Sequence, residues 1–329
     1  MPSPASSLAS IDFAARNTPL QRADRLAVSL GLEPGGLWIK RDDLTGLVGG
    51  GNKARKLELL IAAAIEAGAD TVVTGGAAQS NHVRATAAAA RAAGLACYAV
   101  LAEDSLPVET QGNLILDDLL GTSVVWTSRS TRHDVFDETV RALREEGHSP
   151  YPIPLGGSSP LGSSAYSLCA EEITATLGAG TTTVCAVGSG GTMAGLVNGF
   201  GPDDEVVGFD VGASQTMADD IGPLITETSL LLDRPVTASW QLEASLPGLA
   251  YGEPSDDVFA AIRLVANTEA LVLDPVYSGR AMAGLRQLLW QGWRTTSGPL
   301  VFVHTGGLPA LFTSRYADRF ADPKLIGHG

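Results

Sequence analysis

Residues 71–93 read TVVTGGAAQSNHVRATAAAARAA, the pattern of a strand, a glycine turn and a helix in that order. The run Thr71–Thr74 is short, apolar or β-branched, and Asn81–Ala93 is dominated by alanine. Six residues that begin with Gly75 and Gly76 separate these segments, and Gly94 follows where the helix is expected to end. This unit predicts an α/β protein in which buried strands alternate with covering helices.

The same alternation extends over most of the chain. Further apolar runs predict strands at Ala96–Leu101, Ser123–Trp126, Thr182–Val187, Val206–Val211 and Leu300–His304. Helices are predicted at Lys53–Ala67, Gln111–Leu120, Thr131–Glu146, Gly162–Leu177, Thr192–Gly199 and Gly279–Trp290. Because the apolar runs are too uniform for half-exposed strands, we expect mainly parallel sheets covered on both faces. Ligands are then expected at the sheet edge where the strands end.

Composition and charge narrow the classes of function. The chain has 329 residues, of which 45% are hydrophobic, so a large core is expected. The formal net charge of −14 argues against nucleic acid and against an anionic membrane surface as partners. Neither a secretion leader nor an apolar stretch of about 20 residues is evident, which predicts a cytoplasmic protein.

Three cysteines lie in apolar or small-residue runs, namely Cys97, Cys169 and Cys185. Their spacing fits neither a set of zinc ligands nor a disulfide framework. We therefore expect reduced, buried thiols and no bound metal.

Basic residues after a glycine run form the first candidate site. Residues 49–58 read GGGNKARKLE, and three glycines allow a sharp turn and the close approach of a ligand. Asn52 is expected to cap a helix that begins near Lys53. The positive helix end and the second cation Lys56 are expected to lower the pKa of Lys53, as attack on an aldehyde requires. Solvated basic residues on a helix are the alternative, and this motif alone does not separate the two.

The predicted helix after the first strand has an unusually polar start, Gln79-Ser80-Asn81-His82. Ser80 or Asn81 can cap this helix, and its free backbone N–H groups can hold an anion such as a substrate carboxylate. Capping needs one such residue and the segment has four, so a binding site is favoured over simple capping.

A third candidate is Gly188-Ser189-Gly190-Gly191-Thr192, between a predicted strand and a predicted helix. Backbone N–H groups and the helix dipole converge at such a loop, which is typical of a phosphate site. The segment lacks the Gly-Lys-Ser/Thr ending of a nucleoside-triphosphate loop and the G-x-G-x-x-G dinucleotide spacing. An ordinary tight turn is the alternative interpretation.

Hydroxyl groups follow two more β-like runs, in DPVYSGR and VHTGG. Ser278 and Thr305 can hydrogen-bond a ring nitrogen, and Tyr277 can act as an acid or a positioning group. These hydroxyls, a lysine after a glycine turn, a polar helix start and a phosphate loop together fit an aldehyde cofactor with a phosphate and a ring nitrogen.

Six segments of the chain, in this order, resemble the fold type II family of pyridoxal-phosphate enzymes. They are RDDLTGLVGGGNKARKLE, GAAQSNHVR, TQGN, GSGGTMAGL, DPVYSGRAM and VHTGG. They extend from Arg41 to Gly307 and look most like the branch that contains D-cysteine desulfhydrase and 1-aminocyclopropane-1-carboxylate deaminase. The resemblance implies two open, twisted, mainly parallel sheets flanked by helices, and pyridoxal 5'-phosphate as cofactor. It also implies a homodimer, with a large domain from residues 1–66 and 167–329 and a small domain from 67–166.

The resemblance further implies a role for each matching residue. Lys53 binds the cofactor aldehyde covalently, and its freed amine takes the Cα proton of the substrate. The implied catalytic residues are Lys53, Ser80 and Tyr277. The implied cofactor-binding residues are Lys53, Lys56, Asn81, Gly188, Ser189, Gly190, Gly191, Thr192, Ser278 and Thr305. The implied substrate-binding residues are Gln79, Ser80, Asn81, Tyr251 and Tyr277.

Two positions separate the branches within this resemblance. The deaminases have Glu directly after the position of Tyr277 and Leu in the His-x-Gly-Gly segment, whereas this chain has Ser278 and Thr305. The desulfhydrases have hydroxyl residues at both positions. A neutral hydroxyl leaves the ring a weaker electron sink, which departure of thiolate tolerates better than cyclopropane opening. We therefore expect β-elimination from a small amino acid, with D-cysteine desulfhydration favoured.

Several alternatives remain open from the sequence. The nearest is deamination of 1-aminocyclopropane-1-carboxylate. Arg280 replaces the lysine usual in this branch and would suit a substrate with an extra acidic group, such as cysteate or a related sulfonate. Racemisation or β-replacement on the same fold, and a catalytically silent ligand-binding homologue, complete the set.

Overall fold

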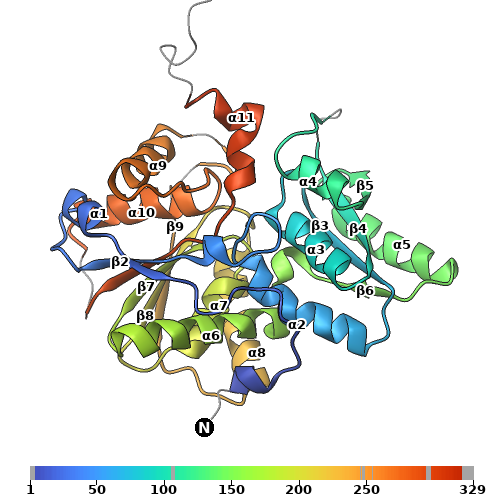
Figure 1. Ribbon diagram of the computed structural model, residues 1–329, viewed down its shortest axis with the longest axis horizontal. Coiled ribbons are helices and arrows are strands. Elements are labelled where there is room, and N and C mark those ends of the chain that lie inside the picture. Colours follow the sequence, from blue (N-terminus) through green and yellow to red (C-terminus); the bar gives the residue numbers. More distant parts are fainter. Residues whose placement is uncertain are drawn as a thin grey trace, which may run out of the picture.

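The computed structural model describes residues 4–104, 108–244, 246, 249–253, 255–293 and 298–320, which form two sheets (Figure 1). The larger sheet has the strand order β1-β2-β10-β7-β8-β9, and the smaller has the order β5-β4-β3-β6. Among the described residues, each strand pair is parallel except β1 with β2. The prediction of two open, mainly parallel sheets is therefore confirmed.

The strands are short, as is usual for buried parallel sheets. In the larger sheet they are β1 (Leu20–Arg22), β2 (Leu37–Lys40), β7 (Thr182–Val187), β8 (Glu205–Asp210), β9 (Ser239–Ala244) and β10 (Leu300–Val303). In the smaller sheet they are β3 (Thr71–Ala77), β4 (Ala96–Ala102), β5 (Ser123–Thr127) and β6 (Pro150–Pro152). The sequence pattern found six of these strands and missed β1, β2, β6 and β9.

The seven predicted helices are present, with bounds that differ by at most two residues. They are α2 (Lys53–Glu66), α3 (Asn81–Ala92), α4 (Asn113–Leu119), α5 (Arg132–Glu145), α6 (Pro160–Leu177), α7 (Gly191–Gly199) and α10 (Ser278–Trp290). The helices that were not predicted are α1 (Asp24–Ser29), α8 (Met217–Leu232), α9 (Asp256–Glu269) and α11 (Ser314–Ala317). Short 3-10 turns occur at η1 (Pro4–Ser7), η2 (Asp42–Leu44), η3 (Leu155–Gly157) and η4 (Leu308–Phe312).

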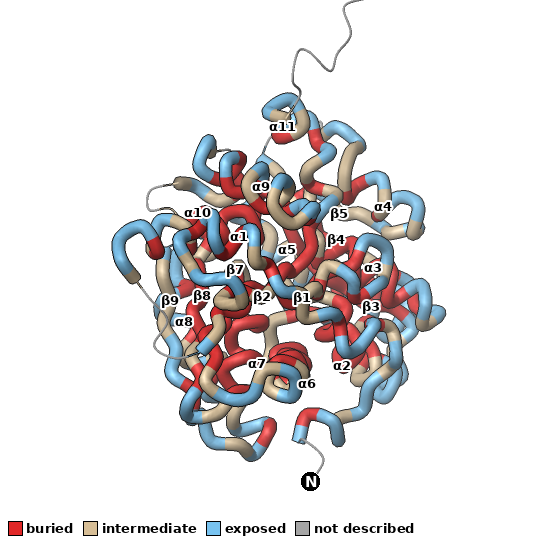
Figure 2. Tube along the Cα trace, turned by 60° about the vertical axis from the view of Figure 1, so that its left-hand side comes forward, coloured by how far each residue is buried: buried red, intermediate tan, exposed pale blue. Residues whose placement is uncertain are grey.

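Helices cover both faces of the larger sheet. Helices α1, α9 and α10 share one apolar core with that sheet, and α6, α7 and α8 share the core on its other face. Helices α2 and α3 pack with the smaller sheet in a third core. Figure 2 shows the buried segments gathered in the interior and the exposed ones on the outer helices and loops. The three cysteines are free and buried, as predicted.

The expectation that the predicted strands are covered on both faces is wrong for β5. Its residues Ser123–Thr127 are exposed or half-buried, because β5 is an edge strand of the smaller sheet. The opposite edge of that sheet is β6, whose sequence Pro-Tyr-Pro is compatible only with an edge because proline donates no ladder hydrogen bond.

The sheets also bear on the predicted division into domains. Every strand of the smaller sheet lies within residues 67–166, and every strand of the larger sheet lies outside that range. Helix α6 runs without interruption across position 166 and packs on α2 and α7. The division at that residue stays a prediction.

Within the described part of the chain, no helix combines the length and the apolar character that crossing a membrane would require.

Candidate active site

The candidate site lies where strands of the two sheets end and the next helices begin. Lys53 is the first residue of α2, as predicted, and its Nζ donates to the carbonyl of Gly156 at 3.2 Å. Asn52 takes the N-cap position but makes no capping bond, contrary to the prediction. Its backbone is held by the carbonyl of Thr305 at 3.1 Å, and its Nδ2 donates to Thr192 Oγ1 at 2.9 Å, so Asn52 ties α2 to α7.

The predicted lowering of the Lys53 pKa is confirmed in direction, with a different cause. Burial lowers the pKa of Lys53 to about 8, whereas the sequence argument relied on the helix end and on Lys56. Burial, followed by the charge of Lys53, holds the pKa of Lys56 well below its usual range. Both amines are therefore poorly solvated, which favours the neutral, nucleophilic form of Lys53.

The neighbourhood of Gly191 is built for a small anion. Lys56 Nζ donates to the carbonyl of Gly156 and to Ser158 Oγ, each at 3.3 Å. A Cβ placed on Gly191 would lie 2.6 Å from Lys56 Nζ, 2.6 Å from Ser158 Oγ and 2.9 Å from Ser163 Oγ. Ser163 Oγ is buried and makes no hydrogen bond within the described residues. An amine and two hydroxyls thus converge at the start of α7, beside the backbone N–H groups of its first turn.

The glycine loop between β7 and α7 is joined to this cluster. Ser189 Oγ lies 2.8 Å from Ser158 Oγ, which also accepts from the backbone N–H of Gly191 at 3.2 Å. In the described part of the chain, no carboxylate forms an ion pair with Lys53 or Lys56. A phosphate at the glycine loop would give these amines the anionic partner that the described residues do not supply.

The polar start of α3 forms another wall of the site. Ser80 is the N-cap residue, and its Oγ accepts from the backbone of Val83 at 3.3 Å, which confirms the predicted capping. Asn81 Oδ1 accepts from Asn113 Nδ2 at 2.9 Å. A Cβ on Gly307 would lie 3.1 Å from Asn81 Nδ2, so the donor end of this amide faces the loop after β10.

Gln79 is engaged with the chain at both ends of its amide. Its Nε2 donates to the carbonyl of Gln111 at 2.9 Å, and its Oε1 accepts from the backbone of Asn113 at 2.8 Å. A Cβ on Gly112 would lie 2.5 Å from Gln79 Oε1, so only glycine fits between them. The structure thus directs Gln79 to the loop before α4 and leaves its predicted contact with substrate a proposal.

Two tyrosines from different loops meet in the site. The hydroxyls of Tyr251 and Tyr277 are hydrogen-bonded to each other, and their rings pack edge to face with centroids 6.0 Å apart. Burial raises the pKa of both phenols, so both stay protonated near neutral pH and can donate a hydrogen bond. A Cβ on Gly188 would lie 2.9 Å from Tyr277 Cε1, which places this tyrosine against the glycine loop.

The two hydroxyls predicted to meet a ring nitrogen differ in their surroundings. Ser278 Oγ donates to Asp274 Oδ1 at 2.6 Å and accepts from the backbone of Asp274 at 3.0 Å. The same carboxylate accepts from the backbone N–H groups of Val276 and Tyr277, so Ser278 belongs to the cap of α10. Thr305 is buried, and its hydroxyl has no hydrogen-bond partner among the described residues.

Comparison with known proteins identifies the family to which the chain belongs. The profile of the family described as "Pyridoxal-phosphate dependent enzyme" matches residues 11–306, which is most of the chain. The chain belongs to the pyridoxal-phosphate-dependent enzymes. Two relatives are the D-cysteine desulfhydrases of Yersinia pestis (strain Pestoides F), 42% identical over 92% of this chain and 94% of the relative, and of Klebsiella pneumoniae (strain 342), 41% identical over 90% and 93%.

Solved structures show the same fold for this pyridoxal-phosphate-dependent enzyme. The crystal structure of an ACC deaminase homologue is 35% identical, covers 96% of each chain and has a TM-score of 0.88. A fungal L-serine ammonia-lyase from Rhizomucor miehei, at 17% identity and a TM-score of 0.68, shares the fold alone. The fold type II architecture and the cofactor pyridoxal 5'-phosphate are thus established for this family member.

Three residues of this pyridoxal-phosphate-dependent enzyme were missed from sequence. Gly156 and Ser158 accept hydrogen bonds from the lysine amines and Ser163 Oγ lies beside Gly191, yet none of the three is among the residues predicted for the site. The signal was present as GGSS at residues 156–159, a glycine-serine turn between a strand and a helix, like the turn at 188–192.

Gly191→Ala is expected to weaken cofactor binding to this enzyme by about tenfold or more, because the new methyl group takes the space between Lys56 Nζ and Ser158 Oγ. Titration of the apoprotein with pyridoxal 5'-phosphate, followed by absorbance, measures this. Gly222→Ala is the control, since a Cβ there meets nothing within 4 Å. Equal affinity for both variants would contradict a phosphate site at Gly191.

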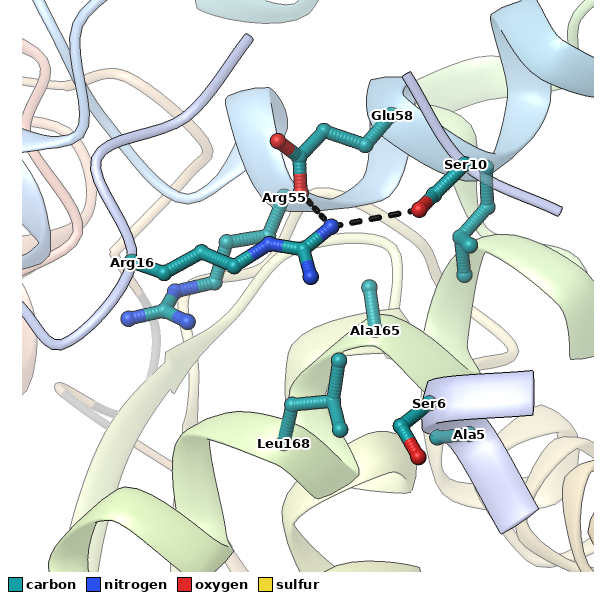
Figure 3. A pocket seen from close by; sticks show the side chains of 9 residues that line it. Ala5, Ser6, Ser10, Arg16, Arg55, Glu58, Ala165 and Leu168 are labelled. Carbon is teal, nitrogen blue, oxygen red and sulfur yellow. Dashed lines mark hydrogen bonds and ion pairs between the residues drawn. The ribbon is translucent and has the colours of Figure 1, made fainter. Parts of the chain in front are cut away.

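The small pocket in Figure 3 is a different place, between the N-terminal segment, α2 and α6. Arg16 pairs there with Glu58 at 3.3 Å and donates to Ser10 Oγ at 3.2 Å. Glu58 Oε1 also accepts from the backbone N–H groups of Phe13 and Ala14. The polar groups around this pocket therefore bond to one another. Their hydrogen bonds attach the N-terminal segment to α2, the helix that carries Lys53.

Proposed function

We propose that this protein is a pyridoxal-phosphate-dependent lyase that removes the β-substituent of a small amino acid, with D-cysteine as the preferred substrate. D-Cysteine and one water would give pyruvate, sulfide and ammonia. The observation that carries the proposal is the 42% identity to D-cysteine desulfhydrases over nine-tenths of the chain. The neutral hydroxyl of Ser278, in place of a carboxylate, supports the same choice.

The bound cofactor withdraws electron density from the substrate Cα and so makes its proton acidic. Lys53 is the residue that takes this proton, because burial lowers its pKa to about 8 and so raises the fraction of neutral amine near neutral pH. Lys56, the loop from Gly188 to Thr192 and Asn81 hold the cofactor, and Thr305 is the hydroxyl free to face its ring nitrogen.

The remaining polar groups orient the substrate. The start of α3, with Ser80 as its cap, offers backbone N–H groups and a hydroxyl to the substrate carboxylate. The hydroxyls of Tyr251 and Tyr277 are protonated and are bonded to each other. We propose that this pair donates a hydrogen bond to the departing thiolate of the substrate. Gln79 contributes by holding the loop of residues 111–113 in place.

A second candidate is deamination of 1-aminocyclopropane-1-carboxylate, because the solved ACC deaminase homologue has a TM-score of 0.88 to this chain. Opening an unactivated ring needs a strong electron sink, and Ser278 provides no carboxylate for the cofactor ring. The structure gives no support to a sulfonate substrate bound by Arg280. That guanidinium donates to the backbone carbonyls of Leu249 and Ala250 instead.

The proposal also covers the assembly of the protein, its location and its division into domains. We infer a homodimer from the resemblance of the motifs, and a cytoplasmic location from the three free, buried cysteines. We also infer a large domain from residues 1–66 and 167–329 and a small one from 67–166, in line with the two sheets.

A substrate panel tests the function. Purified protein is mixed with D-cysteine, L-cysteine, β-chloroalanine, L-cysteate and 1-aminocyclopropane-1-carboxylate, and keto acid and sulfide are measured. We expect kcat/KM for D-cysteine to exceed that for L-cysteine, L-cysteate and the cyclopropane acid by about tenfold or more. Release of 2-oxobutanoate from the cyclopropane acid as the fastest reaction would favour the deaminase, and no keto acid from any substrate would favour a silent homologue.

A further inference from the structure

The loop that carries Tyr251 is held by its backbone carbonyls. Residues 249–252 read Leu-Ala-Tyr-Gly, and the carbonyl oxygens of Leu249, Ala250 and Gly252 each accept a hydrogen bond from a buried side chain. Tyr251 lies between these fastened peptides, and its hydroxyl reaches Tyr277. The position of the Tyr251 ring therefore depends on side chains from outside its own loop.

Arg280 holds the loop on one side of Tyr251. It is the third residue of α10 and is only 1% exposed. One terminal nitrogen donates to the carbonyl of Ala250 at 2.9 Å and the other donates to that of Leu249 at 2.8 Å. The planar fork of a guanidinium suits two neighbouring carbonyls, whereas a lysine ammonium has no such fixed geometry. Since Tyr277 precedes the same helix, α10 fixes both tyrosines.

Tyr316 holds the loop on the other side. It lies in α11, is 4% exposed, and its hydroxyl donates to the carbonyl of Gly252. Gly252 has a φ of +70°, and a Cβ there would lie 3.4 Å from the Tyr316 hydroxyl oxygen. The chain therefore turns tightly against Tyr316 directly after Tyr251.

Helix α11 is also tied to the opposite wall of the site. The backbone of Ser314 donates to Gln111 Oε1 at 2.7 Å, and Gln111 Nε2 donates to Ser314 Oγ at 3.0 Å. The carbonyl of Gln111 in turn accepts from Gln79, the neighbour of Ser80. Figure 1 shows α11 between α9 and α4. A short helix near the end of the chain thus connects the tyrosine loop to the start of α3.

We infer that Arg280 and Tyr316 are positioning residues that together fix Tyr251 over the bound amino acid. This inference rests on the proposed substrate site, of which Tyr251 is a part. Both side chains act through the loop, because their polar atoms donate to its backbone carbonyls. A shift of the loop by about 1 Å is enough to misplace a hydroxyl and to slow a reaction strongly.

The test compares Arg280→Lys and Tyr316→Phe with wild type as holoenzymes. Each variant is expected to raise KM for D-cysteine, or to lower kcat/KM, by about three- to tenfold, since each loses hydrogen bonds of ordinary strength. Affinity for pyridoxal 5'-phosphate is expected to stay within about twofold. Arg286→Lys is the matched control on the same helix, because its guanidinium stacks on Trp290 away from the loop.

A second readout needs no substrate. The amides of Leu249 and Glu253 donate within the loop, to the carbonyls of Leu246 and Ala250. Their hydrogen–deuterium exchange is expected to accelerate by about tenfold or more in both variants and to stay unchanged in Arg286→Lys. Unchanged exchange in both variants would overturn the inference whatever the substrate. Faster exchange without any D-cysteine turnover in wild type would support the positioning and overturn only the proposed function.

Combination with Tyr251→Phe separates positioning from a general loss of stability. If Arg280 and Tyr316 act through the Tyr251 hydroxyl, their effects on kcat/KM are expected to fall to less than about twofold once that hydroxyl is removed. Effects that keep their full size in the Tyr251→Phe background would overturn the inference.

Discussion

Lys53→Ala is expected to lower kcat by about four orders of magnitude or more, because one amine serves both to bind the cofactor covalently and to take the substrate proton. The visible absorbance of the lysine-bound cofactor should disappear together with the activity. Absorbance spectra of the purified variant and assays of keto acid measure both effects. Unchanged folding, judged by circular dichroism, is the control, and a variant that kept full activity would refute the assignment.

The pH dependence of cofactor attachment tests the same residue in wild type. Only the neutral amine attacks an aldehyde, and burial lowers the pKa of Lys53 to about 8. Attachment to the apoprotein should therefore slow as the pH falls through that value, by about tenfold for each pH unit well below it. A rate that stayed constant down to pH 6 would contradict a titrating lysine.

Asp42→Ala is expected to lower the free energy of unfolding by about 3 kcal/mol, since it removes one of the two carboxylate partners of the buried Arg55 guanidinium. Asp42 is 0% exposed and accepts from Arg55 Nε at 2.9 Å, from Thr18 at 2.6 Å and from Tyr166 at 2.6 Å. Arg55 keeps its second ion pair with Glu172, which limits the loss. Chemical denaturation of the holoenzymes measures the difference.

The same variant has a predictable pH dependence. Burial alone would raise the pKa of Asp42, but the charge of Arg55 and the hydrogen bonds outweigh burial and lower it. A carboxylate with a lowered pKa stabilises the protein above its unfolded value of about 3.9, and this contribution is lost as the pH falls through the folded value. The difference in the free energy of unfolding between wild type and Asp42→Ala should therefore become smaller in acid. Asp137→Ala, which removes an exposed carboxylate on α5, is the control and should cost less than about 1 kcal/mol.

The candidate site was predictable where its residues sit at the ends of regular elements. Lys53, Ser80 and the loop at residues 188–192 each begin a helix, and the composition of the segment shows this directly. The direction of each side chain was less predictable. Asn52 bonds α7 instead of capping α2, and Gln79 bonds the loop before α4. A polar side chain near several partners takes the one that the folded chain places at hydrogen-bond distance, and spacing along the sequence does not give that distance.

Strands β2 and β9 were not predicted because the sequence pattern depends on uniformly apolar runs. Strand β9 has the sequence SWQLEA and lies at the edge of the larger sheet, where a half-exposed strand lacks the uniform apolar run used to find the others. Strand β2 ends in Lys40, which is 1% exposed and paired with Glu172. This charge interrupts the apolar pattern that predicts a buried strand, and its partner in α6 lies 132 positions away along the chain.

The sequence by itself determined the alternation of strands and helices, the lysine at the start of α2 and the glycine turns, because hydrophobic period and backbone freedom are local properties. Only the tertiary structure decided which distant groups share the site. Gly156 meets Lys53 across 103 positions, and Gln111 meets Ser314 across 203. Contacts at such separations depend on how the two sheets and their helices pack, and packing is a property of the whole chain.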